Sequence, residues 1–155
     1  MTNPLRSAAA VIGGVAIISL IVEPLEFTLV NAVADQPIQD MADYFAVRNR
    51  PGMLAAKLVY NTLAAILGGY MAARIAQTEE LKHGALAAAV QTTALIWGFT
   101  AGEYASSMPV WMRIAIVAVM GPAMLGGAWI RAQAAGIYRE PGQGVEWDNA
   151  PREEP

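Results

Sequence analysis

Long runs of apolar residues dominate the pattern of hydrophobic and polar positions along this chain. Four segments carry no charged side chain, and each extends into further apolar sequence at its ends. A bilayer core of about 30 Å needs roughly 20 residues of α-helix, so each segment can cross it once its flanks are included. We therefore predict four membrane-spanning helices, near residues 7–33, 52–75, 84–105 and 110–133.

These segments are apolar around the whole helix circumference, whereas the helices of a soluble four-helix bundle need a polar face toward water. The pattern thus predicts an all-α fold, a four-helix transmembrane bundle of up-down-up-down topology formed by residues 1–138. Composition agrees, because 55% of the residues are hydrophobic and only 15% are charged, against about 25% charged in soluble domains. Residues 139–155 are polar and rich in Pro and Gly, which predicts a flexible tail.

The segment between the first two predicted spans, residues 35–51, mixes apolar and acidic positions at roughly helical spacing. Ile38, Met41 and Phe45 alternate there with Asp40 and Asp43. Such a pattern is typical of a short amphipathic helix that lies on a membrane surface. We expect it on the outer side of the bilayer.

The Lys and Arg residues near the span ends predict the orientation, because the more basic side of a membrane protein usually faces the cytoplasm. Six basic residues fall on the side of the two termini and four on the other. We therefore expect a multi-pass protein of a bacterial inner (plasma) membrane with both termini in the cytoplasm. The residues on the side of the termini are Arg6, Arg74, Lys82, Arg131, Arg139 and Arg152. Those on the other side are Arg48, Arg50, Lys57 and Arg113.

A short pattern recurs near the ends of the second and fourth predicted spans. The sequence is LGGYMAAR at 67–74 and LGGAWIR at 125–131. One interpretation is a duplication that gives two parallel helical hairpins, an arrangement found in transporters; the other is chance similarity in a chain rich in Gly and Ala. Together with PVW at 109–111, these segments resemble small, uncharacterised four-helix bacterial membrane proteins. That resemblance implies a four-helix membrane fold and no particular activity.

Small residues recur at every fourth position in each predicted span. Examples are Gly68 in the second span and the series Ala94, Gly98 and Gly102 in the third. Helices in lipid associate largely by close backbone approach, which small residues permit. The small residues therefore predict helix packing, either inside the bundle or, for the series in the third span, against another subunit.

Two carboxylates interrupt the first apolar run. Glu23 and Glu26 lie on one helix face, and Lys57 and Asn61 share a face of the next span at about the same depth. Because an unpaired charge in hydrocarbon costs about 2.5–3.5 kcal/mol, we expect Lys57 to pair with Glu23 or Glu26. This polar cluster either fixes two helices or forms a proton or cation site, unless its side chains reach the interface instead. Glu103 and Arg113, which flank the last turn, are expected to form a second pair.

Several residue types and motifs that particular functions require are missing from the sequence. There is no cysteine, and the net charge of −3 provides no basic surface for nucleic acid. His83 is the only histidine, and we expect it to be solvated in a turn. Neither a catalytic motif nor a phosphate-binding glycine loop is present, so we expect no enzyme and no cofactor.

The expected partners are the lipid bilayer and either other membrane subunits or further copies of this chain. The favoured function is a non-catalytic structural or accessory subunit of a larger membrane assembly or homo-oligomer. The alternative is a small ion or solute transporter that uses Glu23, Glu26 and Lys57. Exposure of these three groups to water discriminates the two functions.

Overall fold

The computed structural model describes residues 4–103 and 105–138, and within these ranges the chain forms helices and no strand. The all-α prediction is confirmed there, and four of the helices are long and apolar enough to cross a membrane. The predicted tail, residues 139–155, lies outside the described residues. The elements in order are α1 (Pro4–Val33), α2 (Met41–Arg48), α3 (Pro51–Ala76), α4 (Glu80–Ala101), the 3-10 helix η1 (Ala105–Ser107) and α5 (Val110–Tyr138).

The helix ends differ from the predicted spans by a few residues, each for a local reason. The first helix begins before its predicted span and includes Arg6, whose Nε donates to the carbonyl of Ile75 at 2.9 Å. The helix α3 stops at Gln77, which adopts a left-handed conformation with φ of 59°. The helix α4 ends at Gly102, earlier than predicted, because that residue is extended.

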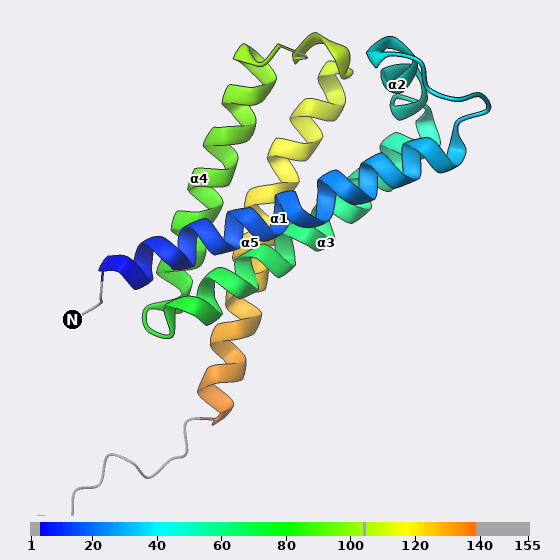
Figure 1. Cartoon of the computed structure of the whole chain (residues 1–155). Coiled ribbons are helices and arrows are strands. Elements are labelled where there is room, and N and C mark those ends of the chain that lie inside the picture. The colour runs from blue at the N-terminus through cyan, green and yellow to red at the C-terminus, as the bar shows by residue number, and fades with distance from the viewer. Residues whose placement is uncertain (1–3, 104, 139–155) are drawn as a thin grey trace, which may run out of the picture.

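The four long helices form two side-by-side pairs that cross each other (Figure 1). One pair is α1 with α3, and the other is α4 with α5. The pairs touch most closely where α3 crosses α5, and they diverge toward the end of the molecule that carries α2 and η1. We call this end the α2 end and the opposite one the N-terminal end.

Glycines form the contact at each close crossing. Gly68 of α3 lies against Gly14 of α1, and a Cβ on Gly68 would lie 2.6 Å from the carbonyl oxygen of Gly14. At the crossing of α3 with α5, a Cβ on Gly69 would overlap the backbone of Met124, and one on Gly127 would overlap the backbone of Ile66. The two Leu-Gly-Gly segments recognised in the sequence therefore meet at one crossing, where the backbones touch directly.

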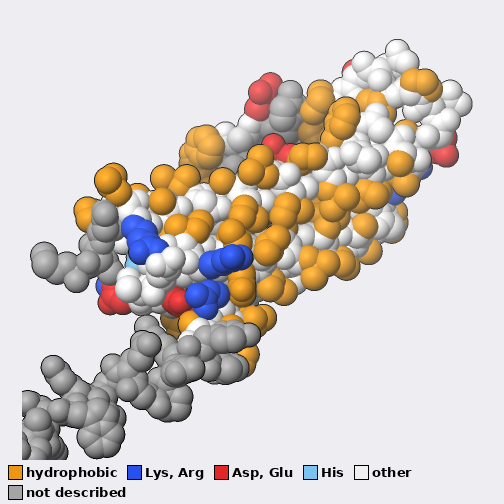
Figure 2. Space-filling view, turned by 60° about the horizontal axis from the view of Figure 1, so that its bottom comes forward, with side chains coloured by type: hydrophobic (Ala, Val, Ile, Leu, Met, Phe, Trp, Pro, Cys, Tyr) orange, Lys and Arg blue, Asp and Glu red, His pale blue; other side chains and the backbone are white. Residues whose placement is uncertain are grey.

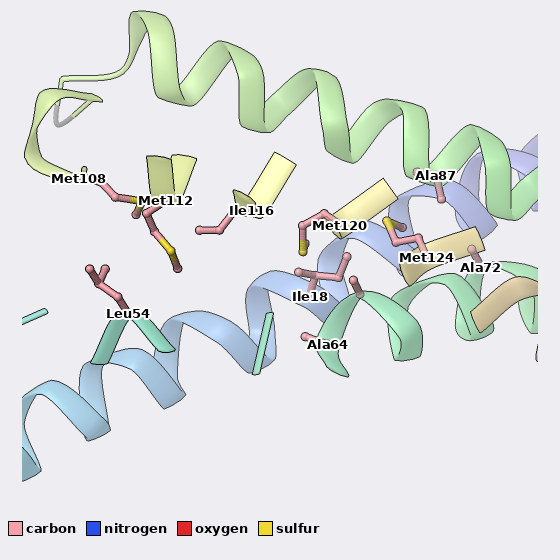
Figure 3. Packing of buried hydrophobic residues seen from close by; sticks show 12 residues of the cluster. Ile18, Leu54, Ala64, Ala72, Ala87, Met108, Met112, Ile116, Met120 and Met124 are labelled. Atoms are coloured by element: carbon pink, nitrogen blue, oxygen red, sulfur yellow. The ribbon is translucent and has the colours of Figure 1, made fainter. Parts of the chain in front are cut away.

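A row of methionines on α5 fills the space between the helix pairs (Figure 3). Met112, Met120 and Met124 are at most 1% exposed. The buried positions recur every fourth residue, so they form one face of the helix. Because a thioether chain is unbranched and adaptable, methionine fits the irregular space between diverging helices. The row on α5 consists of Met112, Ile116, Met120, Met124 and Ala128, and Met108, in the turn before α5, extends it.

The helix α2 packs against α1 and α3 rather than lying free on a surface. It starts at Asp40, whose carboxylate accepts from the backbone N–H of Asp43 at 2.9 Å. Val47 is buried with Val30 and Met53. The predicted helix is therefore present, and it buries Val47 in the protein while Met41 stays 46% exposed.

Large apolar side chains cover the outside of the helices. Figure 2 shows hydrophobic side chains over most of one face and basic side chains gathered near the N-terminal end. Leu20, Phe27 and Trp97 are 72%, 62% and 69% exposed. Exposure of this kind, on every side of long helices, is typical of a surface in contact with lipid.

Candidate functional site

The carboxylate of Glu26 is the centre of a buried polar cluster at the α2 end. Its Oε2 forms an ion pair with Nζ of Lys57 and accepts from the hydroxyl of Tyr60 at 2.6 Å. Its Oε1 forms an ion pair with Nε of Arg48, and the Tyr44 hydroxyl lies 3.5 Å away. We call these five residues the Glu26 centre. They bring together α1, α2 and α3.

Helical spacing explains why these side chains converge. Lys57 and Tyr60 are three residues apart on α3, and Tyr44 and Arg48 are four apart on α2, so each pair lies on one face. The Arg48 guanidinium also lies 5.3 Å from the centre of the Phe45 ring, which keeps it directed toward α1. Of these residues the sequence analysis named Glu26 and Lys57 but not Tyr60, and the contribution of α2 depends on how that helix docks.

Every charge in the Glu26 centre has a partner. Glu26 is 6% exposed and Lys57 is 5% exposed. The burial of two charges is costly unless they are paired and hydrogen-bonded, and here both conditions hold. Burial and the neighbouring Glu26 carboxylate raise the pKa of Tyr44 in α2, so its phenol stays protonated. The arrangement binds three helices and leaves neither Glu26 oxygen free.

The other two members of the predicted cluster do not join the Glu26 centre. Asn61 is buried, but its amide donates to the carbonyl of Lys57 at 2.8 Å within its own helix. Glu23 is exposed, and no ion pair links it to any residue in the described part of the chain. Glu23 and Glu26, which the sequence groups together, therefore have different surroundings.

A cavity of about 730 Å³ opens beside the Glu26 centre, where the two helix pairs diverge. We call it the α2 cavity. Its wall comes from α1, α2, α4, η1 and the turns on either side of η1, and it includes Glu23, Arg48 and Glu103. Much of the remaining wall is apolar or aromatic, with Leu95 and Phe99 from α4.

The series of small residues near the C-terminal end of α4 lines this cavity. Ala94, Gly98 and Gly102 all belong to its wall, and a Cβ on Gly98 would meet nothing within 4 Å. Gly98 therefore has open space beside it within this chain, and its packing against another subunit stays a prediction. For Gly68 the structure places the backbone of α1 in direct contact.

The expected pair of Glu103 and Arg113 is replaced by other contacts. Arg113 donates from Nη1 to the carbonyl of Phe99 at 3.1 Å, which caps the end of α4. Glu103 is exposed beside the α2 cavity. The segment after α2 is joined to η1 by the amide of Asn49, which donates to the carbonyl of Ser107 at 2.7 Å.

His83 is not the solvated side chain that its place in the sequence predicted. It is 4% exposed, with Nε2 2.9 Å from the hydroxyl of Ser7 and Nδ1 3.1 Å from the carbonyl of Glu79. A neutral ring protonated on Nδ1 satisfies both contacts, because the Ser7 hydroxyl then donates to Nε2. No pattern in the sequence indicates this contact, since Ser7 and His83 belong to different helices, α1 and α4.

The described residues contain no group of three or more histidine and carboxylate side chains that are placed to hold a metal ion. Comparison of the chain with protein-family models, with curated proteins and with solved structures finds no match. The function therefore has to be inferred from the Glu26 centre and the α2 cavity.

Proposed function

We propose that this chain is a multi-pass integral membrane protein that serves as a non-catalytic subunit of a larger membrane assembly or homo-oligomer. Its four long helices cross the bilayer in up-down-up-down order, in a bacterial inner membrane with both termini in the cytoplasm. The observation that carries the subunit role is the closed Glu26 centre. A transport site has to release and rebind its ion, whereas both oxygens of Glu26 are engaged by partners from α2 and α3.

The surface supports the membrane location. The exposed side chains of the long helices include Ile12, Val59, Leu63 and Ile114, which are 61% to 66% exposed. Burying such side chains contributes about 1.5–3 kcal/mol each, so lipid or another subunit is a far better surrounding than water. The chain offers no compensating polar face over these helices.

A transporter is the second candidate, and the α2 cavity is the observation that favours it. The cavity is open, and the carboxylate of Glu23, which forms no ion pair in the described part of the chain, lines it from a mostly apolar helix. Ionisable residues on spanning helices often mark ion or substrate pathways. A measurement of solute transport across the bilayer distinguishes a transporter from a subunit that contains a cavity but transports nothing.

The mass of the particle purified in mild detergent or nanodiscs tests the subunit role. We expect a mass above that of one chain, contributed by further copies or by co-purifying membrane proteins. The same material in liposomes is expected to show no proton- or cation-coupled flux above that of empty liposomes. A monomer that carries out such flux contradicts the proposal and supports the transporter.

The orientation is tested by single cysteines, because the natural chain contains none. Gln36→Cys at the α2 end and Thr78→Cys at the N-terminal end are both at exposed positions outside the long helices. We expect a membrane-impermeant maleimide added to spheroplasts, whose inner membrane is intact, to label position 36, and to label position 78 only after permeabilisation. The reverse pattern means that both termini face outward.

A further inference from the structure

Glu23 is a charged residue on a long, mostly apolar helix, and it forms no ion pair in the described part of the chain. It lies three residues before Glu26, which has taken the available cations, Lys57 and Arg48. In the described part of the chain no basic side chain pairs with Glu23, and the residue borders the α2 cavity. An intramembrane carboxylate in this position needs water or a cation from outside the chain.

The charge balance of the α2 cavity favours a cationic occupant. Glu23 and Glu103 contribute two carboxylates with no ion pair in the described residues. The one cation in the wall, Arg48, is already paired with the third carboxylate, Glu26. An anionic ligand would therefore meet uncompensated negative charge, and a cation would remove it.

The remainder of the wall determines what kind of cation fits. Phe99 borders the cavity together with Leu95 and Met108, whereas the ring of Phe45, also in the wall, already lies against the Arg48 guanidinium. Aromatic faces attract organic cations, most strongly when water is excluded. A divalent metal ion, in contrast, needs several oxygen ligands at short distance, and the described residues hold no such group. The volume of about 730 Å³ is in the range of pockets for small organic ligands.

We propose that the α2 cavity is a binding site for a lipophilic organic cation, whose positive charge lies against Glu23 and whose apolar groups lie against α4. Gly98 makes room for it, since the absence of a side chain there keeps the cavity open. The site is independent of the proposed subunit role, because a subunit of an assembly and a transporter can both contain it.

The first experiment measures equilibrium binding of tetraphenylphosphonium to the full-length chain in nanodiscs. Tetraphenylborate has the same shape and the opposite charge, so it controls for simple partitioning into lipid. We expect saturable binding of the phosphonium, with no saturable binding of the borate. Glu23→Gln is expected to weaken phosphonium binding on the order of tenfold or more. Glu79→Gln, which removes an exposed carboxylate at the N-terminal end, is expected to leave it unchanged.

The second experiment fills the cavity without removing a charge. Gly98→Leu places a side chain in open space at the cavity wall, so we expect the protein to fold and phosphonium binding to be lost. Gly126→Leu is the matched control, because Gly126 on α5 also has nothing within 4 Å of a built Cβ but does not line the cavity. Equal phosphonium binding by the natural chain and by both cavity variants would overturn the proposal. Saturable binding of the borate at the same site would overturn it too. Loss of binding in the cavity variants of a chain that stays monomeric would refute the subunit role alone.

Discussion

Replacing Glu26 by glutamine is expected to lower the free energy of unfolding by about 3–5 kcal/mol, the usual range for breaking a buried ion pair. The substitution leaves the ammonium of Lys57, 5% exposed, and the guanidinium of Arg48 without their anion. It also leaves one acceptor oxygen where the carboxylate had two, so the side chain can no longer accept from Tyr60 and Lys57 on one oxygen while it pairs with Arg48 through the other. We expect most of the effect to come from the stranded cations and not from the lost contacts themselves.

Two matched variants separate this effect from a general sensitivity of α1. Lys57→Met is expected to cost less, about 1–3 kcal/mol, because Arg48 and Tyr60 still engage the carboxylate. Glu23→Gln, three residues away and exposed, is expected to change stability by about 0.5 kcal/mol or less. The double variant Glu26→Gln with Lys57→Met should be more stable than Glu26→Gln alone.

Denaturant titration in mixed micelles, followed by circular dichroism, measures these differences. The order of stability is the critical result, because it depends only on which charges are left unpaired. Equal effects of Glu23→Gln and Glu26→Gln would mean that both carboxylates reach water and that the Glu26 centre contributes little.

Substituting alanine for Gly127 is expected to separate α5 from α3 and to lower stability by about 3 kcal/mol, the upper end of the range for overpacked sites. A methyl group there would overlap the carbonyl oxygen of Ile66, which is backbone and cannot move by changing a rotamer. The neighbouring variant Gly126→Ala is the control, since its methyl group has open space. Alanine also favours helix over glycine by about 1 kcal/mol, so Gly126→Ala should be neutral or stabilising.

Thermal unfolding of the two variants in the same detergent measures the contrast. We expect a clearly lower midpoint for Gly127→Ala and an unchanged or higher one for Gly126→Ala. Similar midpoints for both would mean that α3 and α5 are not in backbone contact, and the crossing described above would be incorrect.

The sequence predicted the helices well because hydrophobic length is a property of each segment by itself. The helix over Met41–Arg48 was also foreseen, from its alternation of apolar and acidic positions. The methionine row of α5 could have been found by the same reasoning, because Met108, Met112, Met120 and Met124 recur at multiples of four. Their spacing defines a helix face that is filled by adaptable side chains.

The division between Glu23 and Glu26 was not predictable, since both residues are compatible with the face toward α3. What decides between them is the position of α2, which contributes Arg48 and Tyr44. Similarly, the small residues of α4 resembled a packing stripe. Their exposure follows from the angle between the helix pairs, and a single helix carries no information about that angle.

All partners of Glu26 lie within residues 44–60, which follow it closely in the sequence. During synthesis, the carboxylate can therefore be neutralised as soon as α3 has emerged, before α4 and α5 exist. In the membrane location that we propose, the first two long helices enter the bilayer as a hairpin whose buried charges are already compensated. No side chain of α4 or α5 forms an ion pair with the Glu26 centre, so the second pair joins the first through apolar packing, the backbone contact at Gly69 and Gly127, and hydrogen bonds such as that between His83 and Ser7. A chain truncated after α3 therefore corresponds to an intermediate of the proposed membrane insertion.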